Sequence, residues 1–144
     1  MKIAMASDHG GFELKNAIKA HLEEKGLYEI EDLGTYSKES VDYPDYGQKC
    51  GEAVVSGDAD LGIVCCGTGI GISMAANKVK GVRCGLCTST EMAEMTKKHN
   101  NANVLALGGR TTEKELAFEI VDTWLNTEFE GGRHKRRTDS LDSM

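Results

Sequence analysis

The sequence has little of what marks membrane, secreted or nucleic-acid-binding proteins. No apolar run approaches the roughly 18 residues of a membrane-spanning helix. The opening residues Met1 to Ile3 run straight into a strand-like stretch, without the long apolar segment of a signal peptide. The formal net charge of -6 argues against a general nucleic-acid binder, because such proteins neutralise phosphates with a basic surface. We therefore expect a cytoplasmic protein with neither a nucleic acid nor a membrane as partner.

Cysteine usage gives no sign of a disulfide framework. The chain has five cysteines, an odd number, and the adjacent Cys65 and Cys66 make poor disulfide partners. Reduced thiols in a cytosolic protein explain this pattern better than disulfide bonds do. At 144 residues the chain fits one domain, and a domain of this size buries roughly 68–70% of its unfolded surface. Because no repeat or linker interrupts it, we expect one domain over residues 1–144, with a basic tail from about residue 131.

Nucleotide motifs are also missing. The run G-T-G-I-G at residues 67–71 has its third glycine one position too early for a dinucleotide fingerprint, and no Lys-Ser/Thr pair follows to make a P-loop. A phosphatase loop would need an arginine six residues after the thiol, where this chain has Ile72. No metal-ligand cluster stands out either. The absence of these motifs is consistent with chemistry that needs neither a metal nor an organic cofactor.

Apolar strand-like runs alternate with amphipathic stretches along the chain. This order predicts an α/β, Rossmann-like three-layer sandwich, in which a five-stranded parallel sheet has helices on both faces. The expected strands are residues 2–7, 28–33, 61–65, 82–86 and 104–107. The expected helices are residues 12–25, 46–55, a stretch from 70, 90–99, and a final helix containing 116–125, with Thr111 or Thr112 near its start.

The stretch from Leu61 to Ser73 has the most chemically suggestive pattern. It reads as a buried strand, a thiol, a turn with three glycines and a helix start. Amides converging on a thiol at the positive end of a helix dipole favour a thiolate and can hold an anion. On this pattern Cys65 points into the core, and the thiol of Cys66 beside the glycine turn marks a possible active site. The alternative is that the glycines only make a tight connection.

Polar residues follow three of the expected strands. Asp8 and His9 follow the first, the turn after Cys66 follows the third, and Arg110 follows the fifth. The carboxyl ends of parallel strands share one edge of the sheet, so these groups should converge. His99 and Asn100 precede the fifth strand and would lie at the opposite edge. They reach the site only if the helix before them ends toward it or a partner chain supplies them.

Seven short motifs, spread over nearly the whole chain, resemble the ribose-5-phosphate isomerase B family, which also includes galactose-6-phosphate and allose-6-phosphate isomerases. They are S-D-H-G-G-F from residue 7, D-Y-P from 42, C-G-T-G-I-G-I-S from 66, A-A-N-K from 75, H-N at 99, N-V-L-A-L-G-G-R from 103 and E-G-G-R-H from 130.

This resemblance implies reversible conversion of ribose 5-phosphate to ribulose 5-phosphate through an enediolate, a reaction of the pentose phosphate pathway. It implies that Cys66 is the base and that His99 is the acid that opens the sugar ring, with Thr68 also in the catalytic set. A second branch of the family uses a glutamate at the position of Ile72, so this chain belongs with the cysteine branch. The implied substrate-binding residues are Asp8, His9, Tyr43, Gly67, Thr68, Gly69, Ile70, Gly71, Asn100, Arg110, Arg133 and Arg137.

The resemblance also implies a homodimer or a tetramer. The family's site lies at a dimer interface, to which the tail from about residue 131 would contribute, and several site residues come from the neighbouring subunit. Two alternatives remain open at this point. A six-carbon sugar phosphate could be the substrate, or the domain could be a non-catalytic sugar-phosphate sensor, which needs no acid and base.

Overall fold

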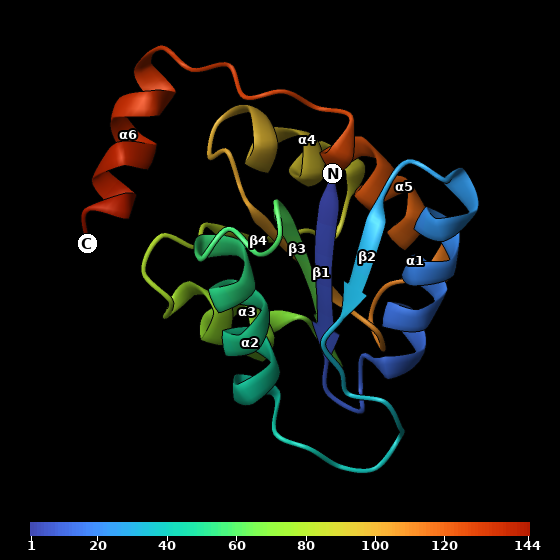
Figure 1. Cartoon of the computed structure of the whole chain (residues 1–144). Coiled ribbons are helices and arrows are strands. Elements are labelled where there is room, and N and C mark those ends of the chain that lie inside the picture. Colours follow the sequence, from blue (N-terminus) through green and yellow to red (C-terminus); the bar gives the residue numbers. More distant parts are fainter.

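A parallel sheet of five strands forms the middle layer of the computed structural model, which describes residues 1–144 (Figure 1). The strand order is β2-β1-β3-β5-β4, so the sheet grows outward in both directions from the β1–β3 pair. This arrangement confirms the predicted Rossmann-like fold. The strands are β1 (Lys2–Ser7), β2 (Glu29–Asp32), β3 (Leu61–Cys66), β4 (Cys84–Leu86) and β5 (Val104–Gly108).

Helices cover both faces of the sheet. Helices α2 and α3 pack on one face, while α1, α4 and α5 pack on the other (Figure 1). None of the helices is both long and apolar enough to cross a membrane. Their bounds are α1 (Phe12–Lys25), α2 (Tyr43–Val55), α3 (Ile70–Asn77), α4 (Thr90–Lys98), α5 (Lys114–Leu125) and α6 (Arg133–Asp142).

Two hydrophobic clusters fill the space between the layers. Side chains alternate along a strand, so neighbouring residues of β3 enter different clusters. Cys65 packs with Trp124 under α1 and α5, whereas Cys66 packs with Ile72 under α2 and α3. The predicted inward position of Cys65 is therefore confirmed. Ile72 is completely buried and serves the packing of α3 against the sheet.

The start of one helix differs from the sequence-based expectation. Helix α2 begins at Tyr43, three residues before the predicted start at 46, and Pro44 lies in its first turn. Proline is well tolerated there because the first-turn amides need no intrahelical acceptor. Helix α5 begins at Lys114 with Glu113 as the capping residue, so Thr111 and Thr112 lie just before the helix start, as expected.

The basic tail is a helix, which the sequence analysis did not predict. Helix α6 has only a thin buried stripe, made by His134 and Thr138, and is otherwise charged and polar. The sequence of this segment has too few regularly spaced apolar residues to indicate a helix by itself. An ion pair of 2.6 Å from Arg83 Nη1 to Asp142 Oδ1 ties the end of α6 to the segment before β4. Tertiary contact compensates for the missing apolar face.

Candidate active site

The loops after β1, β3 and β5 are bonded together at the carboxyl edge of the sheet. The Asp8 amide donates to the Cys65 carbonyl at 3.3 Å, and the Gly109 amide donates to the Cys66 carbonyl at 2.8 Å. A methyl group added at Gly10 would lie 3.0 Å from the Gly67 nitrogen, so the first and third loops are in close contact. This is the switch point between β1 and β3, where open α/β sheets bind ligands.

Cys66 lies at the end of β3 and begins the glycine turn. Its Sγ accepts a hydrogen bond from the Gly69 amide at 3.2 Å, and only 5% of the residue is exposed. Gly69 has φ 80, and a Cβ there would lie 2.8 Å from the carbonyl carbon of Leu107. Glycine is thus required for the turn that places the sulfur at the start of α3.

Three other buried cysteines lie in surroundings that disfavour a thiolate. Burial raises the pKa of Cys50 to about 12 and that of Cys87 to about 11. The pKa of Cys65 is also raised, mainly by burial and to a smaller extent by the neighbouring Cys66 thiol. These thiols stay protonated at neutral pH, which leaves them as small core residues.

The amides of the glycine turn have different partners. The Gly69 amide bonds the Cys66 sulfur, and the Ile70 amide bonds Thr68 Oγ1 at 3.2 Å. The Gly67 and Thr68 amides donate to no acceptor within the chain. They are therefore the turn donors that are free to bind an oxygen atom of a ligand next to Cys66.

Polar side chains surround this turn. Asp8 is almost fully buried, and its Oδ1 accepts the Gly11 amide at 3.1 Å. His9 Nδ1 accepts the Val41 amide at 3.2 Å, so in the neutral ring Nε2 carries the hydrogen. His9 can thus donate a hydrogen bond to a sugar or phosphate oxygen.

Two larger side chains lie against the glycines themselves. A Cβ built on Gly67 would lie 3.3 Å from Arg110 Nη1, and one built on Gly71 would lie 2.7 Å from the Tyr43 ring. Arg110 is further fixed through its own amide, which donates to the Gly67 carbonyl at 2.9 Å. The carboxyl edge therefore gathers most of the predicted site residues: Asp8, His9, Tyr43, Cys66 to Gly71 and Arg110.

The remaining predicted residues lie at the opposite edge. His99 caps the end of α4, Asn100 follows it, and Arg133 and Arg137 belong to α6. Figure 1 shows α6 near the amino end of the sheet, away from the loops that follow the strands. The helix before His99 does not end toward Cys66. The predicted site residues thus form two groups, one at each edge of the sheet, which we call half-sites and which do not meet within one chain.

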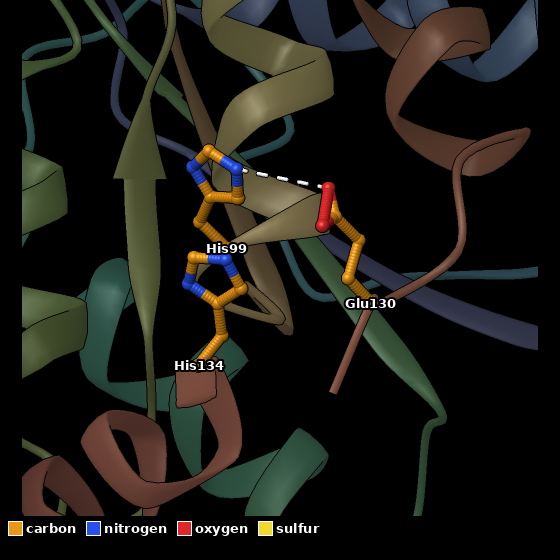
Figure 2. A group of neighbouring side chains, drawn as sticks. All are labelled: His99, Glu130 and His134. Carbon is orange, nitrogen blue, oxygen red and sulfur yellow. Dashed lines mark ion pairs between the residues drawn. The ribbon is translucent and has the colours of Figure 1, made fainter. Parts of the chain in front are cut away.

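His99 is part of a cluster with Glu130 and His134, shown in Figure 2. The rings of His99 and His134 stack with centroids 4.3 Å apart, and His99 Nε2 lies 3.7 Å from Glu130 Oε1. Desolvation and the nearby His99 lower the pKa of His134. Sequence reasoning gave no role to Glu130 or His134, although both belong to the E-G-G-R-H motif that it singled out.

The chain is similar in sequence to known sugar isomerases. A family model described as Ribose/Galactose Isomerase matches residues 3–141. Ribose-5-phosphate isomerase B of Escherichia coli (strain K12) is 48% identical over 143 residues, which cover 99% of this chain and 95% of that protein.

Solved structures are also similar. The Clostridium thermocellum ribose-5-phosphate isomerase B has a TM-score of 0.97 and 55% identity, over 99% of this chain and 96% of that one. The enzyme of Mycoplasma genitalium, with bound ribulose-5-phosphate, has a TM-score of 0.92 and 44% identity, over 99% of this chain and 94% of that one.

Proposed function

The chain belongs to the ribose/galactose isomerase family, and from this premise we propose that it interconverts ribose 5-phosphate and ribulose 5-phosphate. The observation that carries the proposal is the surroundings of Cys66, whose sulfur lies at the start of α3 beside unpaired amides. The E. coli relative is named for this activity, and the M. genitalium structure contains the ketose phosphate.

The proposed chemistry needs only an acid and a base. The Cys66 thiolate removes the proton from C2 of the open-chain aldose and returns it to C1, while the O2 hydroxyl proton is lost and O1 gains one. C2 is oxidised and C1 is reduced within one molecule, so no external electron acceptor is required. The amides of Gly67 and Thr68 bind the enediolate oxygen, and one such donor contributes roughly 3 kcal/mol to the transition state.

Ribose 5-phosphate exists mostly as a closed ring, so a second group must open it. We assign this step to His99, and phosphate binding to Arg133 and Arg137, whose planar guanidinium groups bind phosphate bidentately. Arg110, fixed against Gly67, adds a cation on the Cys66 side. Asp8, His9, Tyr43 and Asn100 would then bind sugar hydroxyls and phosphate oxygens.

This assignment requires a homodimer. Strand β3 alone has six residues, which span roughly 20 Å at 3.3 Å per residue. His99 and Cys66 of the same chain lie at opposite ends of that span, too far apart to share one sugar. A two-fold axis that brings the amino edge of each protomer to the carboxyl edge of its partner creates two equal sites. The segment from about 131, with α6, then contributes to the subunit interface.

The whole chain would thus work as one isomerase domain in a shared assembly. Its five unpaired cysteines suit the reducing cytosol, where we place the reaction.

A substrate panel in deuterium oxide tests the reaction itself. Ribose 5-phosphate should isomerise and gain deuterium at the carbon that receives the proton, while allose 6-phosphate and galactose 6-phosphate should turn over at least tenfold less efficiently. Cys66→Ala should abolish both isomerisation and exchange. Preference for a six-carbon sugar phosphate would replace ribose 5-phosphate as the assigned substrate. Absence of deuterium exchange with every sugar would indicate a non-catalytic sensor.

Mixing two inactive variants tests the shared site. When Cys66→Ala and Arg137→Ala proteins exchange subunits, half of the dimers are mixed, and one site in each mixed dimer is intact. Activity should therefore recover to about a quarter of the wild-type value. If both groups acted within one chain, no mixed dimer would contain an intact site and no recovery would occur. Mixing Cys66→Ala with Cys66→Ser provides the matched control, because no combination restores the base.

A further inference from the structure

We propose that His99, Glu130 and His134 form a binding site for a divalent transition-metal ion of the zinc class, and that the bound ion inhibits the enzyme. Each residue offers one ligand atom, and these atoms all lie within 4.8 Å of one another. Figure 2 shows the two imidazole rings and the carboxylate grouped together, with the carboxylate next to His99.

The donor set matches the chemistry of such ions. Two imidazole nitrogens and one carboxylate oxygen are the three protein ligands of many open zinc sites, with bonds of about 2.0–2.2 Å. Donors around a tetrahedral ion then lie about 3.4 Å apart, so these atoms must approach by about 1 Å. The two rings are stacked with an angle of 13° between their planes, so each ring must also turn about its Cβ–Cγ bond until its nitrogen points at the ion, which ends the stacking. Rotation of the exposed Glu130 side chain brings in the third ligand.

The backbone holds the three residues together without an ion. The Glu130 amide donates to the Lys98 carbonyl at 3.1 Å, which fixes Glu130 beside the end of α4 where His99 lies. The His134 amide donates to the Gly131 carbonyl at 3.1 Å, which fixes the first turn of α6. The side chains of His99 and Glu130 are 40% and 49% exposed, so a water molecule can take the fourth position.

Nearby charge sets the selectivity of the site. Arg133 and Arg137 lie on the same helix as His134 and oppose any cation electrostatically. Magnesium and calcium bind mainly through charge and prefer oxygen ligands, so they should not bind here. Zinc, cobalt(II) and nickel(II) form strong bonds to imidazole nitrogen and can overcome this repulsion.

Inhibition follows because the ion occupies the imidazole nitrogen that His99 needs for proton transfer. This part of the inference rests on the proposed function, whereas metal binding does not. The ion should slow turnover of cyclic ribose 5-phosphate, and a chelator should restore it. Reaction from the open-chain aldehyde, which needs no ring opening, should be much less affected.

Binding is tested with cobalt(II) and the full-length protein. The visible absorption bands of a four-coordinate cobalt site should appear and saturate at one ion per chain. Glu130→Gln changes an exposed side chain and keeps its size, so it should fold normally yet weaken binding at least tenfold. His134→Asn should do the same, with circular dichroism to check its fold. Equal affinity for cobalt(II) in the wild type and both variants would refute the proposed metal site.

Two controls exclude other ligands. His21→Asn removes a histidine that is also paired with a carboxylate, that of Asp122 at 2.9 Å, and it should leave cobalt binding unchanged. Cys66→Ala should bind cobalt like the wild type, and loss of binding in this variant would instead place the ion on the thiol and refute the assignment.

Zinc inhibition is then measured with cyclic and open-chain substrate. Wild-type enzyme should lose most of its activity on the cyclic sugar at zinc concentrations that Glu130→Gln tolerates. If cobalt binds as described but zinc spares turnover of the cyclic sugar, the inhibitory role is wrong and the site stands. If the metal-free protein isomerises no sugar phosphate, the proposed function fails, and the cobalt titration still decides the metal site.

Discussion

The buried ion pair between Lys15 and Asp32 makes a sharp prediction about stability. Lys15 is fully buried, and its Nζ donates to Asp32 Oδ1 at 2.6 Å and to the Thr35 carbonyl at 2.7 Å. Asp32 also accepts the Gly34 amide at 2.9 Å. Replacing Asp32 with asparagine keeps the shape but leaves the ammonium without its counter-charge, so this variant should be strongly destabilised.

The size of the effect follows from the burial of Lys15. Removing one partner of a buried pair costs about 3–5 kcal/mol because an uncompensated charge remains inside. The second pair of Asp32, with the more exposed Lys19 at 3.6 Å, adds only about 0–1 kcal/mol. Lys15→Met removes the charge and keeps the length of the side chain. It should cost far less than Asp32→Asn, since Asp32 is partly exposed and keeps its bond to the Gly34 amide.

The same pair sets a pH dependence with a definite sign. Burial raises the pKa of Asp32, but hydrogen bonds from Lys15 and the Gly34 amide outweigh it, so the pKa lies below the ordinary value of 3.8. A carboxyl group with a lowered pKa in the folded state stabilises the fold above its unfolded pKa, and this contribution disappears as the pH falls through the folded value. The difference between wild type and Asp32→Asn should be full at pH 7 and shrink below about pH 4.

Urea unfolding at matched protein concentration measures these free energies, with fluorescence of the buried Trp124, the only tryptophan, as the signal. The single variants, the double variant Lys15→Met/Asp32→Asn and the wild type form a cycle, in which the double variant should regain most of the loss. A loss below about 1 kcal/mol in Asp32→Asn would refute the reasoning from a buried pair. Equal losses in Asp32→Asn and Lys15→Met would refute it as well.

Four further predictions concern the site and α6. Cys66→Ser should lower kcat at least a hundredfold with little change in KM, measured by steady-state kinetics, because a hydroxyl is a much weaker base than a thiolate; wild-type kcat would exclude Cys66. His99→Asn should reduce turnover of cyclic substrate at least tenfold more than that of open-chain substrate, and equal losses would contradict its role in ring opening. Gly69→Ala should lose most of its activity and about 1–3 kcal/mol of stability in urea unfolding, because residue 69 has a positive φ and an added Cβ would collide with Leu107. Gly57→Ala is the control for backbone strain alone, because Gly57 also has a positive φ but has open space around its Cβ. Arg83→Gln should increase amide hydrogen exchange in α6 without changing it in α1, since it removes the ion pair with Asp142.

The fold was predictable because its strongest signals are local. Strands β1, β3 and β5 are nearly continuous apolar runs, as expected for strands buried on both faces. Helix α1 was predicted to the residue, since its leucine and isoleucine spacing ends at Gly26, which takes a left-handed conformation with φ 68. The start of α2 was predicted three residues too late, because Pro44 is compatible both with a loop and with the first turn of a helix.

The two half-sites differed in predictability for a topological reason. Asp8 follows β1, Cys66 is the last residue of β3, and Arg110 lies just beyond β5, so the shared direction of these parallel strands brings the three residues together. The contacts of His99 with Glu130 and His134 depend on the path of residues 126–132, which form no helix or strand. That path is fixed by long-range contacts such as the one between Arg83 and Asp142, which no local pattern reveals.

The half-site at the amino edge depends on α6 for its structure, so the proposed chemistry requires the tail to be folded. His134 stacks on His99, and Arg133 and Arg137 lie on the same helix. Helix α6, which has almost no apolar face of its own, therefore carries the two arginines that we propose bind phosphate and supports His99, the proposed ring-opening acid, through this stacking. Arg83 holds this helix through Asp142, while its Nε donates to the Asn100 carbonyl at 3.2 Å. Arg83 thus connects α6 to the segment that follows His99, so in the dimer that we propose its loss should lower activity without removing a contact to the substrate.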